Sequence, residues 1–540
     1  AGFLSYEAAP AFDPAMKVRN ESDQPLAWFG VFRGAEGLDD LPETTSSPAT
    51  QTWIASETAA EYERSVQQIH RHIACGDTYQ VNLTLRLTAL LSSDPWTLFA
   101  SLARGQRADC GAYVDTGDWV LCSASPELFF ELEATRIHCK PMKGTAPRGR
   151  TLEEDLEQAR WLRSSAKNRA ENVMIVDMVR NDLGRIAVAD TVRVTRLCEL
   201  EKYPSLYQLT STVEARTEAS VEEIFTALFP CASITGAPKI RAMQIISDLE
   251  TSPRGVYTGT IGLLGPGRRA RFNVAIRTVQ IDTRTNQATY GTGGGILWDS
   301  VASDEWRECQ TKALVLEPPP PDFALLETLR WEPEAGFFLL TRHLDRLSDS
   351  ARYFDFHLDR QLIERQLTRR AQQLSRQPHR FRLLVDARGQ VSLETSVLDN
   401  GRRTWSLAIA ARPIDLTDPF LFHKTTHRQI YDEHRDRFTG HDDVLLWNEN
   451  REVTESTLAN VVVRFGERLL TPPIECGLLG GTLRAELLEK GRVEEAVILL
   501  DELGTADEVW LINSVRQWIP TELELTQSTP AAETHLPEST

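Results

Sequence analysis

The spacing of apolar residues changes from helical to alternating between residues 58 and 87. The apolar positions of the first part are Tyr62, Val66, Ile69 and Ile73. A repeat of three to four residues predicts a helix, which starts at a capping box formed by Thr58 and Glu61 and stops at Gly76. Strict alternation over 81–87 then predicts a strand. Each segment has an apolar face that other elements must cover.

The rest of the chain continues this mixture of helices and strands. Helical patterns cover 152–179, 221–228 and 239–249, a hairpin region covers 119–140, and strands are expected around 257–264, 272–281 and 288–296. No internal repeat is visible. The pattern predicts an α+β fold in which large sheets pack against helices.

A run of four prolines divides the chain. Residues 317–322 can neither continue a helix nor donate to a sheet, so we expect a stiff linker between a domain at 1–316 and a domain at 323–525. Residues 526–540 are polar and are expected to be disordered. The chain starts without Met in what looks like a strand, so we expect the first segment of this domain to be missing.

Composition favours an enzyme that acts on small molecules. The 540 residues are 41% hydrophobic and 25% charged, with a net charge of -18, which argues against nucleic acid or an anionic membrane as the main partner. The eight cysteines form no C-x-x-C pair, a pattern typical of reduced thiols in the cytoplasm. No signal peptide or membrane-spanning run is visible.

Lys143 is the first candidate for chemistry, because it lies between a short apolar strand and a Gly-Thr turn. Taken alone it could equally be a surface amine. Three carboxylates, Glu171, Glu305 and Glu308, suit Mg²⁺, but Glu308 could also form an ordinary i, i+4 ion pair with Lys312 on a solvated helix face.

Two further features of the first half suit an anionic substrate. The glycine-rich run at 291–295 could present backbone N–H groups to a carboxylate or phosphate. Arg277, in an otherwise apolar strand, needs an anionic partner if it is buried, and a substrate carboxylate is one candidate.

The second half offers a second lysine. From 323 to 520 the lysines are Lys424 and Lys490, and Lys490 is explained as a cation at a helix C-terminus. A pyridoxal phosphate enzyme needs a lysine, an acid near the pyridine nitrogen and a phosphate cradle. Glu455, Arg346 and the helix start at 480–484 provide these parts, although Arg346 could instead pair with His343 or Asp349 on a solvated helix.

Seven segments of the first half, in order, resemble the chorismate-utilising enzymes, which include anthranilate, aminodeoxychorismate, isochorismate and salicylate synthases. These segments are 76–82, 125–127, 141–145, 171–177, 233–239, 291–295 and 305–312. The resemblance implies an anthranilate-synthase-like fold. It implies ammonia as nucleophile from Gln80 and, from Lys143, aminodeoxychorismate rather than anthranilate synthesis. Gln208 stands where anthranilate synthases usually have histidine, which weakens the anthranilate alternative further.

The same resemblance implies a role for each matching residue. Lys143 would attack the ring at C2, Glu127 would protonate the leaving hydroxyl, and Mg²⁺ would lie on Glu171 and Glu308 with Glu305 beside it. The substrate oxygens would be held by Thr235, Tyr257, Arg277, Gly293, Gly294, Gly295 and Lys312.

The second half resembles the fold-type IV pyridoxal phosphate family, with its two subdomains and possible homodimers. The implied cofactor-binding residues are Arg346, Lys424, Glu455, Gly481, Thr482, Leu483 and Ser514, and Arg516 would bind a substrate carboxylate. The run 513–516 resembles the lyase subgroup; a transaminase or a docking module without activity is the alternative. We therefore expect synthesis of 4-aminobenzoate, a folate precursor, from chorismate and ammonia supplied by a glutamine amidotransferase partner.

Overall fold

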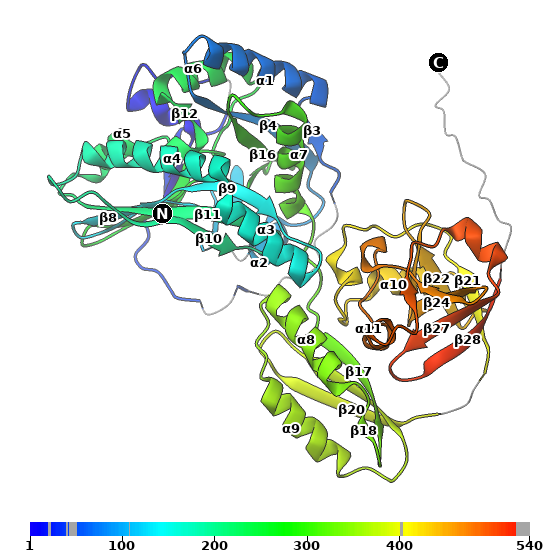
Figure 1. Ribbon diagram of the computed structural model, residues 1–540. Coiled ribbons are helices and arrows are strands. Elements are labelled where there is room, and N and C mark those ends of the chain that lie inside the picture. The colour runs from blue at the N-terminus through cyan, green and yellow to red at the C-terminus, as the bar shows by residue number, and fades with distance from the viewer. Residues whose placement is uncertain (20–22, 39–40, 43–50, 107–108, 400–402, 525–540) are drawn as a thin grey trace. The chain divides into compact units, whose positions relative to one another are not determined.

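The chain forms two compact units, as the computed structural model in Figure 1 shows for residues 1–19, 23–38, 41–42, 51–106, 109–399 and 403–524. The first unit comprises Ala1–Arg148 and Glu157–Pro319, and the second comprises Gly149–Leu156 and the chain from Pro320 onward. The division after Pro319 falls in the proline-rich segment. Gly149–Leu156, which the sequence interpretation placed with the first half, belongs to the second unit. The predicted disordered tail lies outside the described residues.

Two antiparallel sheets form the first unit within the described residues. The larger sheet has the strand order β10-β11-β8-β7-β14-β13-β1-β2, with β9 paired to β11. Its strands are β1 (Gly2–Leu4), β2 (Ala27–Phe29), β7 (Leu128–Glu133), β8 (Arg136–Lys140), β9 (Met142–Pro147), β10 (Arg193–Lys202), β11 (Leu206–Arg216), β13 (Thr260–Gly265) and β14 (Arg269–Asn273).

The smaller sheet has the order β12-β4-β16-β15-β6-β5, with β3 paired to β4. Its strands are β3 (Ile54–Ala55), β4 (Gln80–Leu90), β5 (Ala112–Asp115), β6 (Trp119–Ser123), β12 (Gly236–Ala237), β15 (Thr278–Asp282) and β16 (Gln287–Ile296). The alternation over 81–87 predicts one covered face, but most of β4 is buried on both faces.

Helices cover these sheets (Figure 1). The α-helices of this region are α1 (Ala59–Ala74), α2 (Pro95–Gln106), α3 (Leu152–Ser164), α4 (Ala166–Gly184), α5 (Val221–Leu228), α6 (Lys239–Leu249) and α7 (Ala302–Ala313), with 3₁₀ turns η1 (Tyr6–Ala11), η2 (Ala232–Ile234) and η3 (Leu314–Leu316). The predicted capping box of α1 is present, and the bounds of α5 and α6 match the predicted segments. The single helix expected at 152–179 is two helices, because Ser165 adopts an extended conformation and caps α4.

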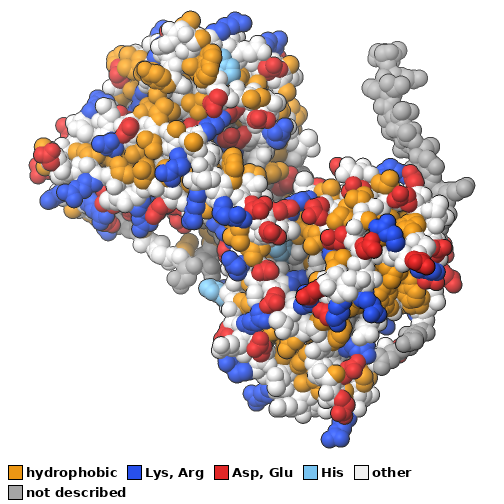
Figure 2. Space-filling view, in the orientation of Figure 1, with side chains coloured by type: hydrophobic (Ala, Val, Ile, Leu, Met, Phe, Trp, Pro, Cys, Tyr) orange, Lys and Arg blue, Asp and Glu red, His pale blue; other side chains and the backbone are white. Residues whose placement is uncertain are grey.

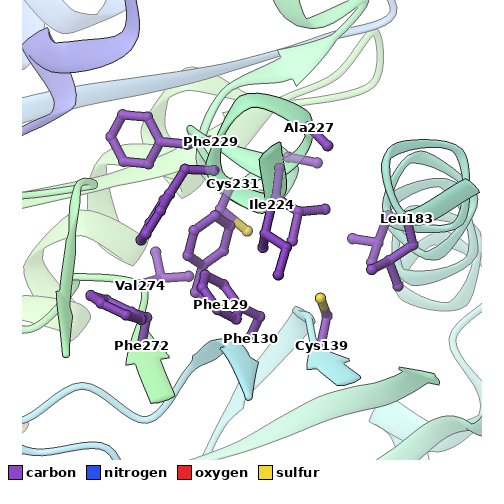
Figure 3. Packing of buried hydrophobic residues seen from close by; sticks show 14 of the residues in the cluster. Phe129, Phe130, Cys139, Leu183, Ile224, Ala227, Phe229, Cys231, Phe272 and Val274 are labelled. Carbon is purple, nitrogen blue, oxygen red and sulfur yellow. The ribbon is translucent and has the colours of Figure 1, made fainter. Parts of the chain in front are cut away.

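An aromatic core holds α4 and α5 against the larger sheet (Figure 3). The rings of Phe130 and Phe272 come from paired strands and stack at 5.3 Å, and Phe225 of α5 meets Phe272 edge-on at 5.1 Å. Such offset and edge-to-face pairs add specific geometry to the burial of apolar area. The core therefore fixes the strands and helix from which the site residues extend.

The single strand expected at 272–281 is wrong. It is two strands that belong to different sheets, because β14 ends at Asn273 and β15 starts at Thr278. Between them the chain crosses from the larger to the smaller sheet, and Arg277 takes a left-handed φ of 49°. The crossing places this arginine at a bend rather than within a strand.

The second unit contains a four-stranded and an eight-stranded sheet within the described residues. The smaller has the order β18-β17-β19-β20, with strands β17 (Leu325–Glu332), β18 (Gly336–Phe337), β19 (His379–Val385) and β20 (Val391–Val397). The larger has the order β23-β22-β21-β28-β27-β24-β25-β26, and an additional pairing of β23 with β24 closes six of these strands into a ring. Its strands are β21 (Trp405–Ile409), β22 (Asp443–Trp447), β23 (Val453–Ser456), β24 (Asn460–Phe465), β25 (Arg468–Thr471), β26 (Glu494–Glu495), β27 (Glu508–Asn513) and β28 (Gln517–Leu523).

The helices of the second unit complete its two cores. They are α8 (Leu340–Phe354), α9 (Arg360–Ala371), α10 (Gln429–Arg435) and α11 (Thr482–Glu489), with 3₁₀ turns η4 (Pro419–Leu421), η5 (Ile474–Cys476) and η6 (Leu500–Thr505). Residues of α8 and α9 pack with β17 and β19, and the larger sheet has its own cluster centred on β24 and β27. Basic and acidic side chains are interspersed on the face shown in Figure 2. Within the described residues, no helix combines the length and apolarity needed to cross a bilayer.

Candidate active sites

A cavity of about 420 Å³ in the first unit collects most of the site residues expected in that half. Those that line it are Glu127, Lys143, Glu171, Tyr257, Arg277, Gly293, Gly295, Glu305, Glu308 and Lys312, and Gln208 lines it too. Gln80, Thr235 and Gly294 do not line it. The lining comes from β9, α4, β16, α7 and the turns around Tyr257 and Arg277, so the cavity lies where both sheets and their covering helices contribute.

Lys143 extends from β9 into this cavity. Asn172 of α4 donates a hydrogen bond of 3.2 Å to the Lys143 carbonyl and so ties the strand to the helix. Burial lowers the pKa of the Lys143 amine, and the neighbouring Lys312 lowers it further, against the opposing charge of Glu171. A lowered pKa leaves more of the amine in its free, nucleophilic form at neutral pH. Lys143 is therefore not an ordinary surface amine.

Glu127 is a buried acid beside this amine. Its side chain is 3% exposed, and the Ser233 hydroxyl donates a hydrogen bond of 2.7 Å to Oε1. Burial raises the pKa of Glu127 to about 7, although the Ser233 hydrogen bond and the charge of Lys143 both oppose the rise. Such a carboxyl group carries a proton over much of the neutral range and can act as a general acid.

Glu171, Glu305 and Glu308 bring three carboxylates to the same cavity. Burial raises the pKa of Glu171 and of Glu305, whereas Lys312, 2.6 Å from Glu308, outweighs burial and lowers the pKa of Glu308. In the described part of the chain, no three His, Cys, Asp or Glu side chains converge closely enough to hold a metal ion. The carboxylates face one space without forming a closed cage.

The glycine-rich run forms the second half of β16, in agreement with the strand expected at 288–296. Gly291 to Ile296 pair with β4, while the pairing of β16 with β15 stops at Tyr290. In an antiparallel pair, alternate residues turn their N–H and C=O away from the partner strand. The Gly293 carbonyl accepts from Lys312 Nζ at 2.8 Å, so Gly293 and Gly295 belong to the set that faces the open edge. Gly294 belongs to the set that faces β4.

Gln80 lies behind Gly295 rather than on the cavity wall. A Cβ on Gly295 would lie 2.1 Å from Gln80 Nε2 and 3.0 Å from Lys143 Nζ. Gln80 is 1% exposed, and within the described residues neither atom of its amide has a hydrogen-bond partner. The glycine therefore provides the close approach that brings this unpaired amide toward Lys143.

Thr235 and Arg277 have protein partners in place of the substrate oxygens expected for them. Thr235 is fully buried and its hydroxyl donates to the carbonyls of Cys231 and Ala232, so it is not directed at the cavity. Arg277 lines the cavity, but its guanidinium donates to the Gln106 side chain and lies over the Tyr203 ring. Burial lowers the pKa of Arg277.

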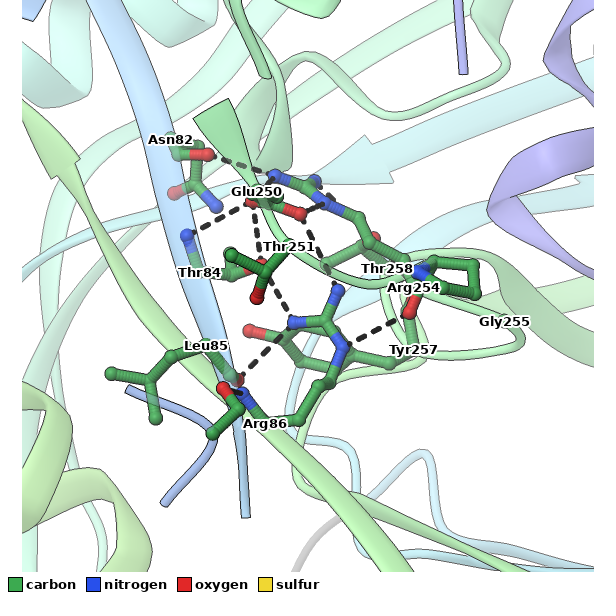
Figure 4. A network of polar contacts seen from close by, with 12 residues as sticks. Asn82, Thr84, Leu85, Arg86, Glu250, Thr251, Arg254, Gly255, Tyr257 and Thr258 are labelled. Carbon is green, nitrogen blue, oxygen red and sulfur yellow. Dashed lines mark hydrogen bonds and ion pairs between the residues drawn. The ribbon is translucent and has the colours of Figure 1, made fainter. Parts of the chain in front are cut away.

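Tyr257 is supported by a buried polar network (Figure 4). Glu250 accepts hydrogen bonds from Arg254 and pairs with Arg86, whose guanidinium lies 5.2 Å from the centre of the Tyr257 ring. On its other side the ring approaches Gly291, where a Cβ would lie 2.2 Å from the nearest ring atom. These contacts hold the Tyr257 ring in a fixed position beside the cavity.

A second cavity, of about 740 Å³, lies in the second unit. It is lined by every site residue expected in that half: Arg346, Lys424, Glu455, Gly481, Thr482, Leu483, Ser514 and Arg516. Ser514 donates to the Thr328 carbonyl at 3.4 Å, and the Arg516 guanidinium lies over the Trp405 ring.

Lys424 and Glu455 are two buried ionisable residues that line this cavity and have shifted pKa values. Burial lowers the pKa of Lys424 to about 8, helped by the charges of Arg346 and Arg428. Burial raises the pKa of Glu455 to about 7, against hydrogen bonds from the Leu479 N–H and the Tyr431 hydroxyl, the latter at 2.8 Å. An acid held in this way suits the pyridine nitrogen of a cofactor whose aldehyde reaches the lysine.

Another part of the cavity lining suits a phosphate. Gly481 and Thr482 begin α11, whose unpaired N–H groups favour an anion, and Arg346 of α8 lies beside them. Arg346 does not pair with His343 or Asp349 on a solvated face, because its side chain is 14% exposed and binds Glu327. Together with Lys424 and Glu455 these groups fit pyridoxal phosphate.

Two arginines extend the second cavity along the four-stranded sheet. Arg380 and Arg382 of β19 line it, next to Thr328 of β17 and Ser396 of β20. Their neighbours Phe381 and Leu383 point into the core. The alternation of charged and apolar residues over 380–383 is visible in the sequence and could have indicated this charged face.

Other contributing residues also escaped the sequence reasoning. Ser233, Asn172 and Lys167 belong to the first site, and Glu327 and Tyr431 belong to the second. Ser233 lies in one of the segments that carried the resemblance. Its partner Glu127 is distant in the sequence, so the position of the serine does not predict the hydrogen bond. In the sequence, Glu327 is visible only as a charged residue in a largely apolar strand, and this does not identify its partners.

Comparison with known proteins finds one family match in each half of the chain. Residues 1–318 match the chorismate binding enzyme family, and residues 324–522 match the class IV amino-transferase family. Aminodeoxychorismate synthase component 1 of Salmonella typhimurium is 40% identical over 270 residues, covering 49% of this chain and 59% of that protein. Anthranilate synthase component 1 of Streptomyces coelicolor is 36% identical over 278 residues, covering 50% and 54%.

A solved structure shares the fold of the first unit. Anthranilate synthase component I from Streptococcus pneumoniae is 25% identical, with a TM-score of 0.51 over 58% of this chain and 79% of that chain. The chain spans less than two thirds of the length of its curated relatives. It belongs to the chorismate binding enzyme family and carries a class IV amino-transferase domain after the proline-rich segment.

Proposed function

We propose that the chain makes 4-aminobenzoate in two steps: amination of chorismate to 4-amino-4-deoxychorismate in the first unit, then loss of pyruvate from that product in the second. The observation that carries the proposal is that each unit holds a lysine of lowered pKa and an acid of raised pKa in one cavity. The relatives named aminodeoxychorismate synthase component 1 support the first step.

In the first step the ring hydroxyl at C4 is a poor leaving group. Glu127 donates a proton to it, Lys143 forms a bond to C2 and gives up a proton, both ring double bonds shift and water leaves from C4. Ammonia then adds at C4 and gives up a proton while both double bonds return, which breaks the bond to Lys143 and restores the protonated or free amine. The lysine is regenerated, so one water is exchanged for one ammonia overall.

Mg²⁺ is the metal that best fits the carboxylates of this cavity. It prefers oxygen ligands and is usually held by one or two protein carboxylates, with water and substrate completing the shell. Glu171 and Glu308 would hold it, with Glu305 beside them, and it would neutralise the ring carboxylate of chorismate. The raised pKa values of Glu171 and Glu305 support a cation at this position.

Ammonia is the nucleophile that Gln80 favours. Its unpaired, buried amide beside Lys143 offers hydrogen bonds to a small neutral molecule and no base to activate water. The ammonia would come from a glutamine amidotransferase, as the designation of the relatives as component 1 suggests.

Pyridoxal phosphate in the second unit would draw electrons from the substrate carbon that bears the amine. Lys424 would be placed to remove the proton from ring carbon C4. Glu455 would hold the pyridine nitrogen, while Arg346, Gly481 and Thr482 would hold the phosphate. Loss of the enolpyruvyl group as pyruvate leaves an aromatic ring, which drives the step forward.

The arginines of β19 support a lyase over a transaminase. An amino acid carries its carboxylate on the carbon that bears the amine, whereas 4-amino-4-deoxychorismate carries two carboxylates farther from its amine. Arg380 and Arg382 on the sheet face, with Arg516, offer cationic partners away from Lys424.

Product analysis tests the proposal. The purified chain, with chorismate, ammonium, Mg²⁺ and pyridoxal phosphate, should release 4-aminobenzoate and pyruvate in equal amounts. Without pyridoxal phosphate, 4-amino-4-deoxychorismate should accumulate. Anthranilate as the product would contradict the first step. A keto acid formed from an added amino donor, without 4-aminobenzoate, would identify a transaminase.

A further inference from the structure

A buried ion-pair network lies behind the phosphate end of the second cavity. Glu327 of β17 and His343 of α8 are each 1% exposed. Glu327 Oε2 lies 2.6 Å from His343 Nδ1 and accepts from Arg346 Nη2 at 2.7 Å, and its Oε1 accepts from Arg346 Nε at 2.8 Å. The Glu327 carboxylate thus contacts two side chains of α8, those of His343 and Arg346.

Both branches of this network end where the chain enters α11. His343 Nε2 lies 3.3 Å from the Thr482 hydroxyl, and Arg346 Nη1 donates to the Gly480 carbonyl at 3.1 Å. Glu327 therefore connects β17, through α8, to the start of α11. A rigid connection of this kind reduces the ordering that a ligand must impose when it binds.

The donor count of Arg346 shows what remains for a ligand. A guanidinium has five N–H donors. The Nε donor and one Nη2 donor bind Glu327, and one Nη1 donor binds Gly480. One donor on each terminal nitrogen remains, on a side chain that lines the cavity. The fork left by this pairing matches two oxygens of a phosphate.

The neighbouring charges keep the Glu327 carboxylate ionised. Burial alone would favour the neutral acid, but the charges of Arg346 and His343 outweigh it and lower the pKa of Glu327 to about 2. The carboxylate stays ionised at any pH at which the protein would be assayed. A buried charge of this kind is costly without its partners, so removing Glu327 would release Arg346 and His343 together.

We propose that Glu327 and His343 are positioning residues for the phosphate of the cofactor: Glu327 presets the Arg346 fork, and His343 presets the Thr482 hydroxyl at the start of α11. This inference rests on the proposed use of pyridoxal phosphate. Neither residue is assigned a contact with the pyridine ring in this role. The charge of Glu327 also raises the pKa of Lys424, and this effect acts on ligands with and without a phosphate alike. The contribution to phosphate binding is therefore measured as a difference between two such ligands.

Comparing two ligands that differ only in the phosphate tests this role. Equilibrium binding of pyridoxal 5′-phosphate and of pyridoxal to the full chain, followed by their visible absorbance, gives the ratio of the two dissociation constants. Glu327→Gln should weaken binding of the phosphorylated ligand about tenfold or more relative to pyridoxal, because the altered charge near Lys424 affects both ligands and cancels in the ratio. His343→Phe should act in the same direction with a smaller effect. Added inorganic phosphate should compete less well in both variants.

Ser350→Ala is the matched control, because Ser350 is a buried residue of the same helix whose hydroxyl bonds to His423. It should leave the ratio unchanged. If Glu327→Gln does not fold, Glu327→Asp provides the second test, since the shorter side chain cannot reach both partners. Equal loss of both ligands, or an unchanged ratio, would overturn the inference. Failure of the unaltered chain to bind either ligand would instead overturn the proposed function, and the inference with it.

Discussion

The Ser233 hydroxyl donates a hydrogen bond of 2.7 Å to Oε1 of Glu127, and both side chains are buried. The hydrogen bond favours the ionised carboxylate and so opposes the effect of burial on its pKa. Ser233 therefore sets how far the pKa of the proposed general acid rises. The relationship connects η2 to the segment before β7, which are far apart in the sequence.

Ser233→Ala should move the pH profile of the first step to higher pH. The acid must be protonated to act, so activity falls as pH rises through the pKa of Glu127, near 7. Without the hydrogen bond that pKa rises, and the falling limb should shift upward by about half a unit to one unit. The measurement is kcat/KM for chorismate against pH, with total ammonium adjusted to keep free ammonia constant.

Thr226→Ala is the control for this shift, because its hydroxyl bonds to the Glu222 carbonyl on the exposed side of α5. Its profile should overlay that of the unaltered chain. A falling limb that stays in place in Ser233→Ala would show that Glu127 is not the group that titrates.

Gly295→Ala should abolish the first step without unfolding the chain. The new Cβ would lie 2.1 Å from Gln80 Nε2, a distance that no pair of unbonded atoms tolerates, so Gln80 and Lys143 must move. We expect a loss of at least a hundredfold in chorismate amination, with pyruvate release from added 4-amino-4-deoxychorismate unchanged. Gly184→Ala, where no heavy atom lies within 4 Å of the new Cβ, should leave both steps unaltered.

Much of the first site could be predicted from the sequence, and the failures have physical reasons. Helix ends at α1, α5 and α6 follow from local capping and spacing. The strand expected at 288–296 is present as β16, but the sequence does not show why it carries four glycines: Tyr257, Gln80 and the β4 backbone approach Gly291, Gly293 and Gly295 too closely for a side chain. These contacts join residues that are far apart in the sequence, so no local sequence pattern predicts them.

The partners of buried polar groups were the least predictable part. Arg277 was expected to need an anionic partner, but its guanidinium contacts the neutral Gln106 side chain and the Tyr203 ring. Both come from distant segments, and neither lies at a recognisable spacing from it. The pairing of Glu327 with Arg346 likewise joins a strand to a helix. In contrast, residues fixed by a motif, such as Lys424 and Glu455, were placed in one cavity by the sequence alone.

Lys143→Ala should stop formation of 4-amino-4-deoxychorismate. The amine supplies the covalent bond at C2, and alanine has no nucleophile to replace it at this position. Chorismate consumption with ammonium should fall at least a thousandfold, while added 4-amino-4-deoxychorismate is still converted to 4-aminobenzoate. Lys140→Ala, which removes a partly exposed lysine paired with Glu201, is the matched control. Unchanged turnover in Lys143→Ala would refute the covalent role.

Lys424→Ala should give the reciprocal result. The chain should lose the visible absorbance of the lysine-bound cofactor and the release of pyruvate, and it should accumulate 4-amino-4-deoxychorismate. Lys490→Ala, whose amine is exposed and pairs with Glu486, should behave like the unaltered chain. Retention of pyruvate release by Lys424→Ala would place the second chemistry elsewhere.

Arg380→Ala should separate substrate binding from cofactor binding in the second unit. The residue lines the outer part of the cavity on the β19 face, so its loss should raise KM for 4-amino-4-deoxychorismate about tenfold, the usual effect of removing one charged hydrogen bond. The absorbance of the bound cofactor and its dissociation constant should stay unchanged, because the phosphate would be bound by Arg346 and the start of α11.

Arg388→Ala is the control. It removes an arginine in the turn that connects β19 to β20, away from the cavity, and should leave KM unaltered. Equal KM values for the two variants would show that the second carboxylate is held by other groups, and Arg516→Ala would then be the next variant to compare.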